Sequence, residues 1–245
     1  MTREILGSAA MQPSPFVLFG RDHLIVLALA LIFPVLLGIF ARFANNRAVD
    51  RTIRWLFAAL LIGNWIFWFV AFRRNGWLTL GDELPLNLCD WANIAIIIAL
   101  LTGNQRAYEL GYFWALAGTL QGLLTPDTQF GFPEVRFIIF SIFHAGIIAA
   151  VLYMAIGSRF RPYWSSLPRV AAWSLLYAVV AGLVDWQFGV NYGFLRAKPA
   201  NISLLDMMPP WPGYIPILFA MGIASMFIYY APFAVIDFYK RRRQA

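Results

Sequence analysis

The sequence predicts an all-α membrane protein, a single bundle of seven transmembrane helices that occupies residues 1–245. Two observations support this prediction. First, 61% of the 245 residues are hydrophobic and only 13% are charged, whereas soluble domains average about 45–50% and about 25%. Second, seven segments are apolar over about 20 residues each, the length that crosses a bilayer as a helix. The composition excludes a disordered chain, a coiled coil and an ordinary soluble domain.

The expected spans are continuous apolar runs separated by short polar segments. They are too long and too uniformly apolar for the alternating strands of a membrane barrel. No connecting segment is long enough to form a second domain. The seven expected spans are residues 23–41, 53–72, 85–102, 107–124, 135–156, 169–188 and 213–238.

Lysine and arginine are distributed unevenly around these spans. The segments that follow the first, third, fifth and seventh spans contain twelve of them, and the segments on the other side contain seven. Because Lys and Arg are enriched in cytoplasmic loops, we expect the N-terminus outside and the C-terminus inside, across the cell membrane if the source is bacterial. The basic residues flank membrane segments, so we expect membrane lipids as partners and no nucleic acid.

Polar residues gather on the half of the bundle that this topology places outside. Polar groups within a bilayer are costly, so they are functional candidates. Cys89 lies about one turn into the third span and shares a helix face with Asn87, Asp90 and Asn93, which we expect to point into the bundle. His144 lies nine residues into the fifth span, roughly 13 Å deep at the helical rise per residue. The other candidates on this half are Asp127, Asp185, Asn191, Tyr192, Arg196, Lys198, Asp206 and Trp211.

Cys89 and His144 together indicate nucleophilic catalysis. A thiol can attack a carbonyl when a base removes its proton, and such partners can be far apart in sequence. Each residue also has a structural interpretation, because a lone Cys in a span is commonly a small apolar side chain and a buried imidazole can be satisfied by its neighbours. His23, near the outer end of the first span, is expected to be structural. One Cys and two His without an HExxH spacing argue against a metal site, and no cofactor is expected.

The outer loops contain groups that can bind a lipid headgroup. Arg136, Arg196 and Lys198 are available for a phosphate, while Asp127 and Asp206 can orient a histidine or cap helices. The same loops have an equally plain structural interpretation as turns with interfacial Trp and Tyr anchors. Both interpretations remain open from the residues alone.

Four features of this chain occur together in one known family. They are LPLNLCD at residues 84–90, His144, NYGFLRAKP at residues 191–199 and LLDMMPPWPGY at residues 204–214. In their order and spacing the sequence resembles the YwaF-like integral membrane proteins, the family that includes animal transmembrane protein 164. The resemblance covers most of the chain and implies a seven-span bundle.

The resemblance also implies an activity. The animal member is understood as a cysteine-dependent acyltransferase that moves fatty acyl chains between phospholipids, and by this resemblance Cys89 is the nucleophile and His144 its base. The sequence departs from the family at one position, because Asn87 stands where bacterial members commonly have histidine. Asn87 can still donate a hydrogen bond.

The functional expectation is therefore a lipid acyltransferase with a Cys–His site on the outer half of the bundle. Oxyanion donors are expected among Asn87, Asn191 and Tyr192. Two alternatives stay open, a lipid hydrolase that uses the same site and a small-molecule transporter or binding protein. A retinal protein is excluded because the only lysines, Lys198 and Lys240, do not lie in the middle of a span.

Overall fold

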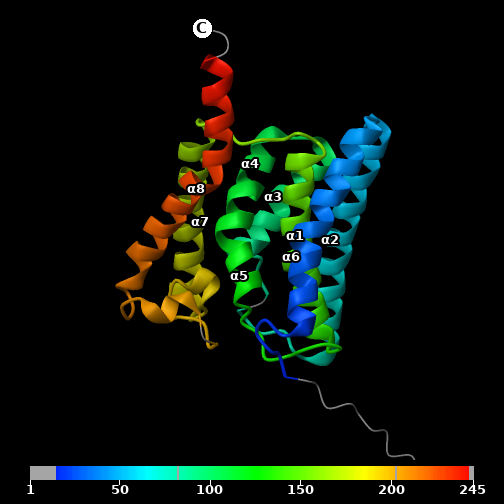
Figure 1. Ribbon diagram of the computed structural model, residues 1–245. Helices are drawn as coiled ribbons and strands as arrows, with labels where there is room; N and C mark the ends of the chain where they lie inside the picture. The colour runs from blue at the N-terminus through cyan, green and yellow to red at the C-terminus, as the bar shows by residue number, and fades with distance from the viewer. Residues whose placement is uncertain (1–14, 82, 202, 243–245) are drawn as a thin grey trace, which may run out of the picture.

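The computed structural model describes residues 15–81, 83–201 and 203–242, and every regular element of this part of the chain is helical (Figure 1). Six helices have fifteen or more residues, namely α1 (Arg21–Ala44), α2 (Arg47–Asn75), α3 (Leu88–Thr102), α6 (Val135–Ile156), α7 (Ser166–Phe188) and α8 (Tyr214–Arg242). Between α3 and α6 the chain forms α4 (Gln105–Trp114), the π-helical segment η1 (Ala115–Thr119) and α5 (Leu120–Leu124). Two short 3-10 helices, η2 (Tyr192–Phe194) and η3 (Leu204–Met207), lie between α7 and α8.

Five of the expected spans are confirmed as helices that are long and apolar enough to cross a membrane. They are α1, α2, α6, α7 and α8, counted over the described residues. The protein is therefore a multi-pass membrane protein. The prediction for α6 matches its observed bounds, residue for residue, and the other four differ by a few residues at their ends.

The two remaining expected spans are less regular than predicted. Helix α3 begins at Leu88, later than the predicted start at residue 85, because Asn87 is its N-cap. With fifteen residues it is about 22 Å long, shorter than the hydrocarbon core of a typical bilayer. The predicted span 107–124 is helical throughout, as part of a run over 105–124, but the middle of this run, η1, is π-helical and not α-helical. A count of seven spans accordingly stays a prediction.

The start of α1 and the end of α8 lie at opposite ends of the bundle (Figure 1). This placement agrees with an odd number of crossings. Which end faces the cytoplasm stays a prediction, and Arg3 and Arg243, which contribute to the charge count behind it, lie outside the described residues.

Close packing between α3 and the α4–η1 run forms the centre of the core. Ala92, Ile96 and Leu100 on α3 are fully buried. A Cβ on Gly111 of α4 would lie 3.3 Å from the Cβ of Ile96, so this glycine lets the two helices approach closely. Helices α7 and α8 pack at the side of this core, and much of their apolar surface is exposed where lipid would surround the bundle (Figure 1).

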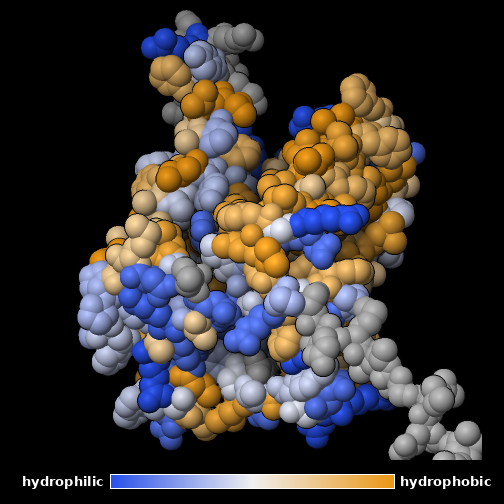
Figure 2. Space-filling model, turned by 60° about the horizontal axis from the view of Figure 1, so that its bottom comes forward, coloured by the Kyte–Doolittle hydropathy of each residue, from blue (hydrophilic) through white to orange (hydrophobic). Residues whose placement is uncertain are grey.

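The two ends of the bundle differ in their connections. One end, which we call the loop end, contains the longer segments 76–87, 125–134 and 189–213, and the opposite end contains the connections 45–46, 103–104 and 157–165. Hydrophilic residues gather at the loop end, while apolar residues cover the flank of the helices (Figure 2).

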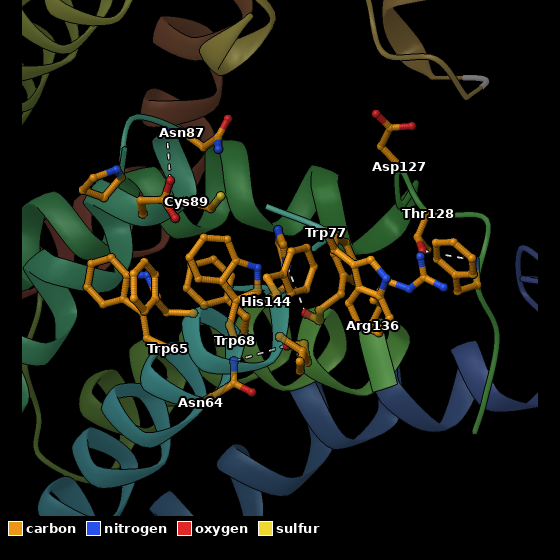
Figure 3. Close-up of a pocket in the computed structure, with 18 of the residues that line it drawn as sticks. Asn64, Trp65, Trp68, Trp77, Asn87, Cys89, Asp127, Thr128, Arg136 and His144 are labelled. Atoms are coloured by element: carbon orange, nitrogen blue, oxygen red, sulfur yellow. Dashed lines mark hydrogen bonds between the residues drawn. The ribbon is translucent and has the colours of Figure 1, made fainter. Parts of the chain in front are cut away.

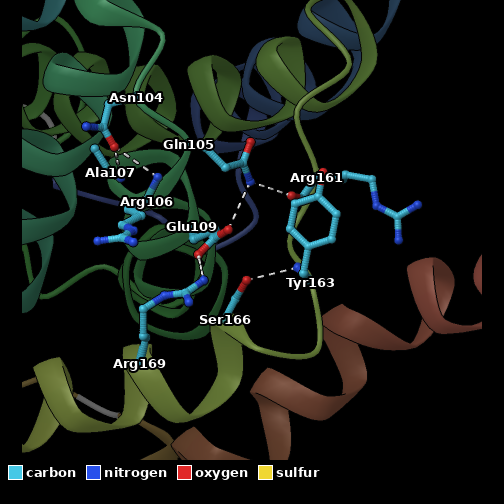
Figure 4. Close-up of polar contacts among 9 residues, drawn as sticks. All are labelled: Asn104, Gln105, Arg106, Ala107, Glu109, Arg161, Tyr163, Ser166 and Arg169. Carbon is cyan, nitrogen blue, oxygen red and sulfur yellow. Dashed lines mark hydrogen bonds and ion pairs between the residues drawn. The ribbon is translucent and has the colours of Figure 1, made fainter.

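At the opposite end a buried carboxylate joins two helices and a loop (Figure 4). Glu109 of α4 is 2% exposed; it accepts a hydrogen bond from Gln105 Nε2 at 3.0 Å and pairs with Arg169 of α7 at 2.6 Å. Gln105 also donates to the carbonyl of Arg161 at 2.7 Å. These bonds hold α4, α7 and the 157–165 connection together.

Candidate functional site

A pocket of about 910 Å³ opens at the loop end between α2, α3 and α6 (Figure 3). Its lining combines an aromatic wall with a smaller set of polar groups, the composition typical of a ligand site. Five of the residues predicted for the site line it: Asn87, Cys89, Asp90, Asp127 and His144.

Cys89 is the second residue of α3 and is held there by the start of the helix. Asn87 is the N-cap, and its backbone N–H donates to the Asp90 carboxylate at 2.9 Å. The Asn87 side-chain oxygen accepts a hydrogen bond from the backbone of Gly193 at 3.4 Å, which ties this turn to the 189–213 segment. Because Cys89 lies in the first turn, its backbone N–H has no acceptor within the helix. As predicted for this face of α3, Asn93 is fully buried, one turn further on.

His144 lies in the middle of α6 with one ring nitrogen engaged. Its Nδ1 is 3.0 Å from the carbonyl oxygen of Phe140, so Nδ1 donates the proton and Nε2 keeps its lone pair in the neutral ring. The Phe140 ring stacks on the imidazole at 4.0 Å between centroids. On α5, Gly122 lies against the ring: a Cβ there would be 3.5 Å from Nε2. The imidazole is therefore fixed in orientation, with Nε2 available as a base.

The two histidines of the chain differ in how their nitrogens are used. His23 is buried; its Nδ1 accepts from the backbone N–H of Phe19 at 3.0 Å and its Nε2 donates to the carbonyl of Leu123 at 2.8 Å. Nδ1 of His23 thus fixes the turn before α1, and Nε2 holds the start of α1 against the end of α5, as expected of a structural histidine. In His144, by contrast, Nδ1 has a hydrogen-bond partner among the described residues and Nε2 has none.

One wall of the pocket is apolar and reaches the flank of the bundle. Its aromatic residues are Trp65, Trp68 and Phe72 of α2 and Phe140 and Phe143 of α6. Two further lining residues of α2 are exposed on the outside, Ile66 to 60% and Phe69 to 45%. The pocket is accordingly bordered both by the loop end and by the lipid-facing side of α2.

Polar residues line the pocket where it meets the loops. Asp127 accepts hydrogen bonds from the backbone N–H and the side-chain amide of Asn201, at 3.2 and 2.6 Å. Arg136, at the start of α6, pairs with Glu134 at 2.7 Å. Of the three basic residues predicted as phosphate ligands, Arg136 is the one that lines the pocket.

The other predicted site residues lie outside the pocket lining, in or beside the 189–213 segment. Asp185 accepts from the backbone N–H of Tyr192 at 2.7 Å, and the Tyr192 hydroxyl donates to the carbonyl of Leu80 at 3.0 Å. The side chain of Asn191 bonds the backbone of Ala197 as both donor and acceptor. These contacts fold the segment and fasten it to the turn before α3.

The remaining side chains of this set also bond to the segment itself. Arg196 donates to the carbonyl of Asp185 at 3.4 Å, and Lys198 donates to that of Met208 at 2.8 Å. Asp206 accepts from the backbone of Ser203, and Trp211 donates to the carbonyl of Leu195. That these seven residues bind the substrate stays a prediction.

Several lining residues were not found from the sequence. Trp65, Trp68 and Phe72 recur at helical spacing on α2, which also describes an ordinary lipid-facing stripe. Trp77 carried no signal of its own, and neither did Gly122, which lies against His144 but outside the pocket lining. Only the packing of α2 and α5 against α6 brings the aromatic residues of α2 to the pocket and Gly122 to His144.

The fold and the pocket define a class, a multi-pass helical membrane protein with a cysteine and a histidine in one pocket near the end of the bundle. Within that class, the chain belongs to the TMEM164 family, whose sequence model matches residues 18–230. An uncharacterized protein of Treponema pallidum (strain Nichols) is 23% identical over 238 residues, which cover 94% of each chain. No solved structure matches the chain.

Proposed function

We propose that the protein is a membrane acyltransferase that moves fatty acyl chains between phospholipids through Cys89 and His144. The observation that supports this most directly is that both side chains line one largely apolar pocket, with Nε2 of His144 free of internal hydrogen bonds among the described residues. Membership of the TMEM164 family agrees with the proposal.

In the first half-reaction, Nε2 of His144 takes the thiol proton and the Cys89 sulfur bonds to the carbonyl carbon of a lipid ester. The ester C–O bond then breaks, and the departing lysolipid oxygen takes the proton from the imidazolium. A thioester on Cys89 remains. In the second half-reaction a lysolipid hydroxyl gives its proton to His144 and attacks the thioester; the new ester leaves, and the sulfur recovers the proton.

The carbonyl oxygen becomes negative in both half-reactions and needs hydrogen-bond donors. The candidates are the backbone N–H of Cys89, in the first turn of α3, and the side-chain amide of Asn87, which lines the pocket. Asn191 and Tyr192, the other predicted donors, are engaged within the loops. We therefore assign the oxyanion site to the start of α3.

The pocket wall on α2 offers a route for the substrate. Exposed Ile66 and Phe69 border the cavity on the side that lipid would contact. An acyl chain can enter there without leaving an apolar environment, which avoids the cost of about 0.8 kcal/mol for each CH₂ exposed to water.

A hydrolase that uses the same two residues is the second candidate. It is favoured by the polar residues Asp127 and Asn201 at the loop end of the pocket, through which water could reach a thioester. A transporter has less support, because Glu109 and its partners hold the helices together at the opposite end.

The thioester is the decisive species to detect. The chain has a single cysteine, so any acyl-thioester adduct must be on Cys89. Purified protein is incubated with a phospholipid that bears an activated acyl ester, and the intact mass is measured before and after treatment with neutral hydroxylamine. We expect the unchanged protein to gain the mass of one acyl group and to lose it again in hydroxylamine. The Cys89→Ser protein should form no adduct that hydroxylamine removes.

Product analysis then separates transfer from hydrolysis. With a labelled donor and an unlabelled lysolipid, transfer predicts label in the new phospholipid, whereas hydrolysis predicts free labelled fatty acid. Full lipid exchange by Cys89→Ser would overturn both candidates.

A further inference from the structure

We propose that Arg136 is the residue that recognises the phosphate of the lipid, and so fixes which ester reaches Cys89. The link to Cys89 rests on the proposed function. Phosphate binding itself is argued from the geometry of Arg136 and can be tested by binding measurements alone.

Two aromatic rings lie against the guanidinium of Arg136, which Figure 3 shows beside Trp77. The carbon Cζ lies 3.4 Å from the centroid of the Phe130 ring and 4.4 Å from that of Trp77. Stacking of this kind suits the planar guanidinium of Arg and not the compact ammonium of Lys. The rings come from two different loop-end segments, so the group is held in position before any ligand binds.

Glu134 covers one edge of the same guanidinium. One carboxylate oxygen accepts from Nε of Arg136 at 2.7 Å, and the other accepts from the backbone N–H of Arg136 at 2.6 Å. Among the described residues, no hydrogen bond is made by the two terminal nitrogens. Two N–H groups side by side on an oriented guanidinium match the oxygens of a phosphate.

The other two basic candidates are less suited to this task. Lys198 donates to the carbonyl of Met208, and Arg196 donates to the carbonyl of Asp185. Neither lines the pocket. Arg136 alone among the three combines a place in the pocket with unoccupied donors.

The position of Arg136 along α6 sets where the rest of a ligand would lie. Arg136 and His144 are eight residues apart on one helix, which is about 12 Å along its axis. Because Arg136 Nε bonds to Glu134, which precedes α6, the guanidinium lies at the loop end, and the glycerol phosphate and ester parts of the ligand have to cover the distance to His144. With the phosphate at Arg136, an acyl ester would lie near His144 and its chain along Trp65 and Trp68. The ligand is therefore an amphiphile with a phosphate, taken from the membrane.

The experiment compares three ligands that differ by one part each. Monoacylglycerol lacks the phosphate, glycerol 3-phosphate lacks the acyl chain, and lysophosphatidic acid has both. Binding to the purified full-length Cys89→Ala protein in detergent is measured by competition against a fluorescent lysophosphatidic acid, or directly by calorimetry. The variants are Arg136→Gln, Arg136→Lys and, as a matched loss of charge at an exposed position of the loop end, Arg74→Gln.

We expect Arg136→Gln to weaken lysophosphatidic acid about tenfold to hundredfold, the range of charge-assisted hydrogen bonds. Monoacylglycerol should bind as before, which also shows that the variant is folded. Arg136→Lys should recover part of the affinity, and Arg74→Gln should change neither ligand. Glycerol 3-phosphate should bind at least a hundredfold more weakly than lysophosphatidic acid.

Two results would overturn the assignment: equal weakening of both acyl ligands by Arg136→Gln, which indicates a structural role, or no change in either. Tight binding of glycerol 3-phosphate would overturn the membrane source and make this a site for a soluble phosphate. Because the Cys89→Ala protein cannot form a thioester, these results do not depend on acyl transfer. If the protein binds lysophosphatidic acid through Arg136 but forms no thioester, the proposed acyl transfer is rejected and the phosphate site stands.

Discussion

The two ends of the bundle contain similar polar residues and use them differently. At the opposite end, Glu109 receives hydrogen bonds from Gln105 and Arg169, and Gln105 reaches the next connection. At the loop end, His144 and Arg136 each use part of their hydrogen-bonding capacity to fix their own orientation and keep the rest facing a pocket. Fully paired groups hold helices together, whereas a partly paired group in a cavity can act on a ligand.

This comparison separates stability from activity. Partly paired residues that line the pocket should affect chemistry with little change in stability, and fully paired residues such as Glu109 should do the reverse. Substitutions at four positions test the contrast, from the largest expected effect to the smallest.

Replacement of Cys89, the proposed nucleophile, should have the largest effect. Cys89→Ala should lower acyl transfer by about 10⁴-fold or more, as loss of a nucleophile does in related chemistry, while the melting temperature in detergent stays the same. The measurement is transfer of a labelled acyl chain to a lysolipid by purified protein. A rate near that of the unchanged protein would place the chemistry elsewhere.

Replacement of His144, the proposed base, should have the next largest effect. His144→Gln should slow thioester formation by about 10²–10⁴-fold, the usual contribution of a general base. His23→Gln is the matched control, because both nitrogens of His23 hold the fold. It should lower the melting temperature and leave the rate per folded molecule unchanged. Equal losses of rate in the two variants would remove the distinction between the histidines.

At the opposite end the effect should be on stability. Glu109→Ala leaves Gln105 and Arg169 without their buried acceptor, which should cost about 2 kcal/mol. Arg169 is partly exposed, so its charge can turn to water and the cost stays at this level. The measurement is unfolding in mixed micelles, with the exposed Arg106→Gln as control. A stable Glu109→Ala protein that has lost acyl transfer would contradict the contrast between the ends.

The smallest effect is expected at Gly122. A single methyl there would make ordinary contact with the His144 ring, at 3.4 Å to Cδ2, so Gly122→Ala should keep most of the activity. Gly122→Val adds atoms beyond that position and should displace the imidazole, which we expect to slow transfer about tenfold. Steady-state rates of the two variants provide the test, and equal rates would show that the ring is not confined from this side.

Much of the fold could be predicted because long apolar segments have few alternatives in a membrane. The predicted span 135–156 agrees with α6 at both ends. The third and fourth spans were less predictable, because their form depends on contacts between them. Gly111 and Gly118 let the α4–η1 run lie against α3. No pattern in the sequence predicted the π-helical segment.

The site could be predicted only in part for a similar reason. Periodicity indicated that Cys89 and Asn93 would face inward, and the cost of a polar group deep in an apolar span singled out His144. Neither could distinguish loop residues that line a cavity, such as Asp127, from those that bond to their own loop, such as Asn191 and Asp206. That distinction depends on where a folded loop directs its side chains.

The sequence by itself determined that this chain is a helical membrane protein and which two reactive side chains lie within its helices, because hydrophobic length and polar cost are properties of the residues. The tertiary structure decided the rest. It brought the start of α3 and the middle of α6, 55 residues apart at Cys89 and His144, to one cavity. It also placed Arg136 in the pocket lining and Arg196 and Lys198 outside it, because the atoms left free for a ligand are known only once every other hydrogen bond has been made.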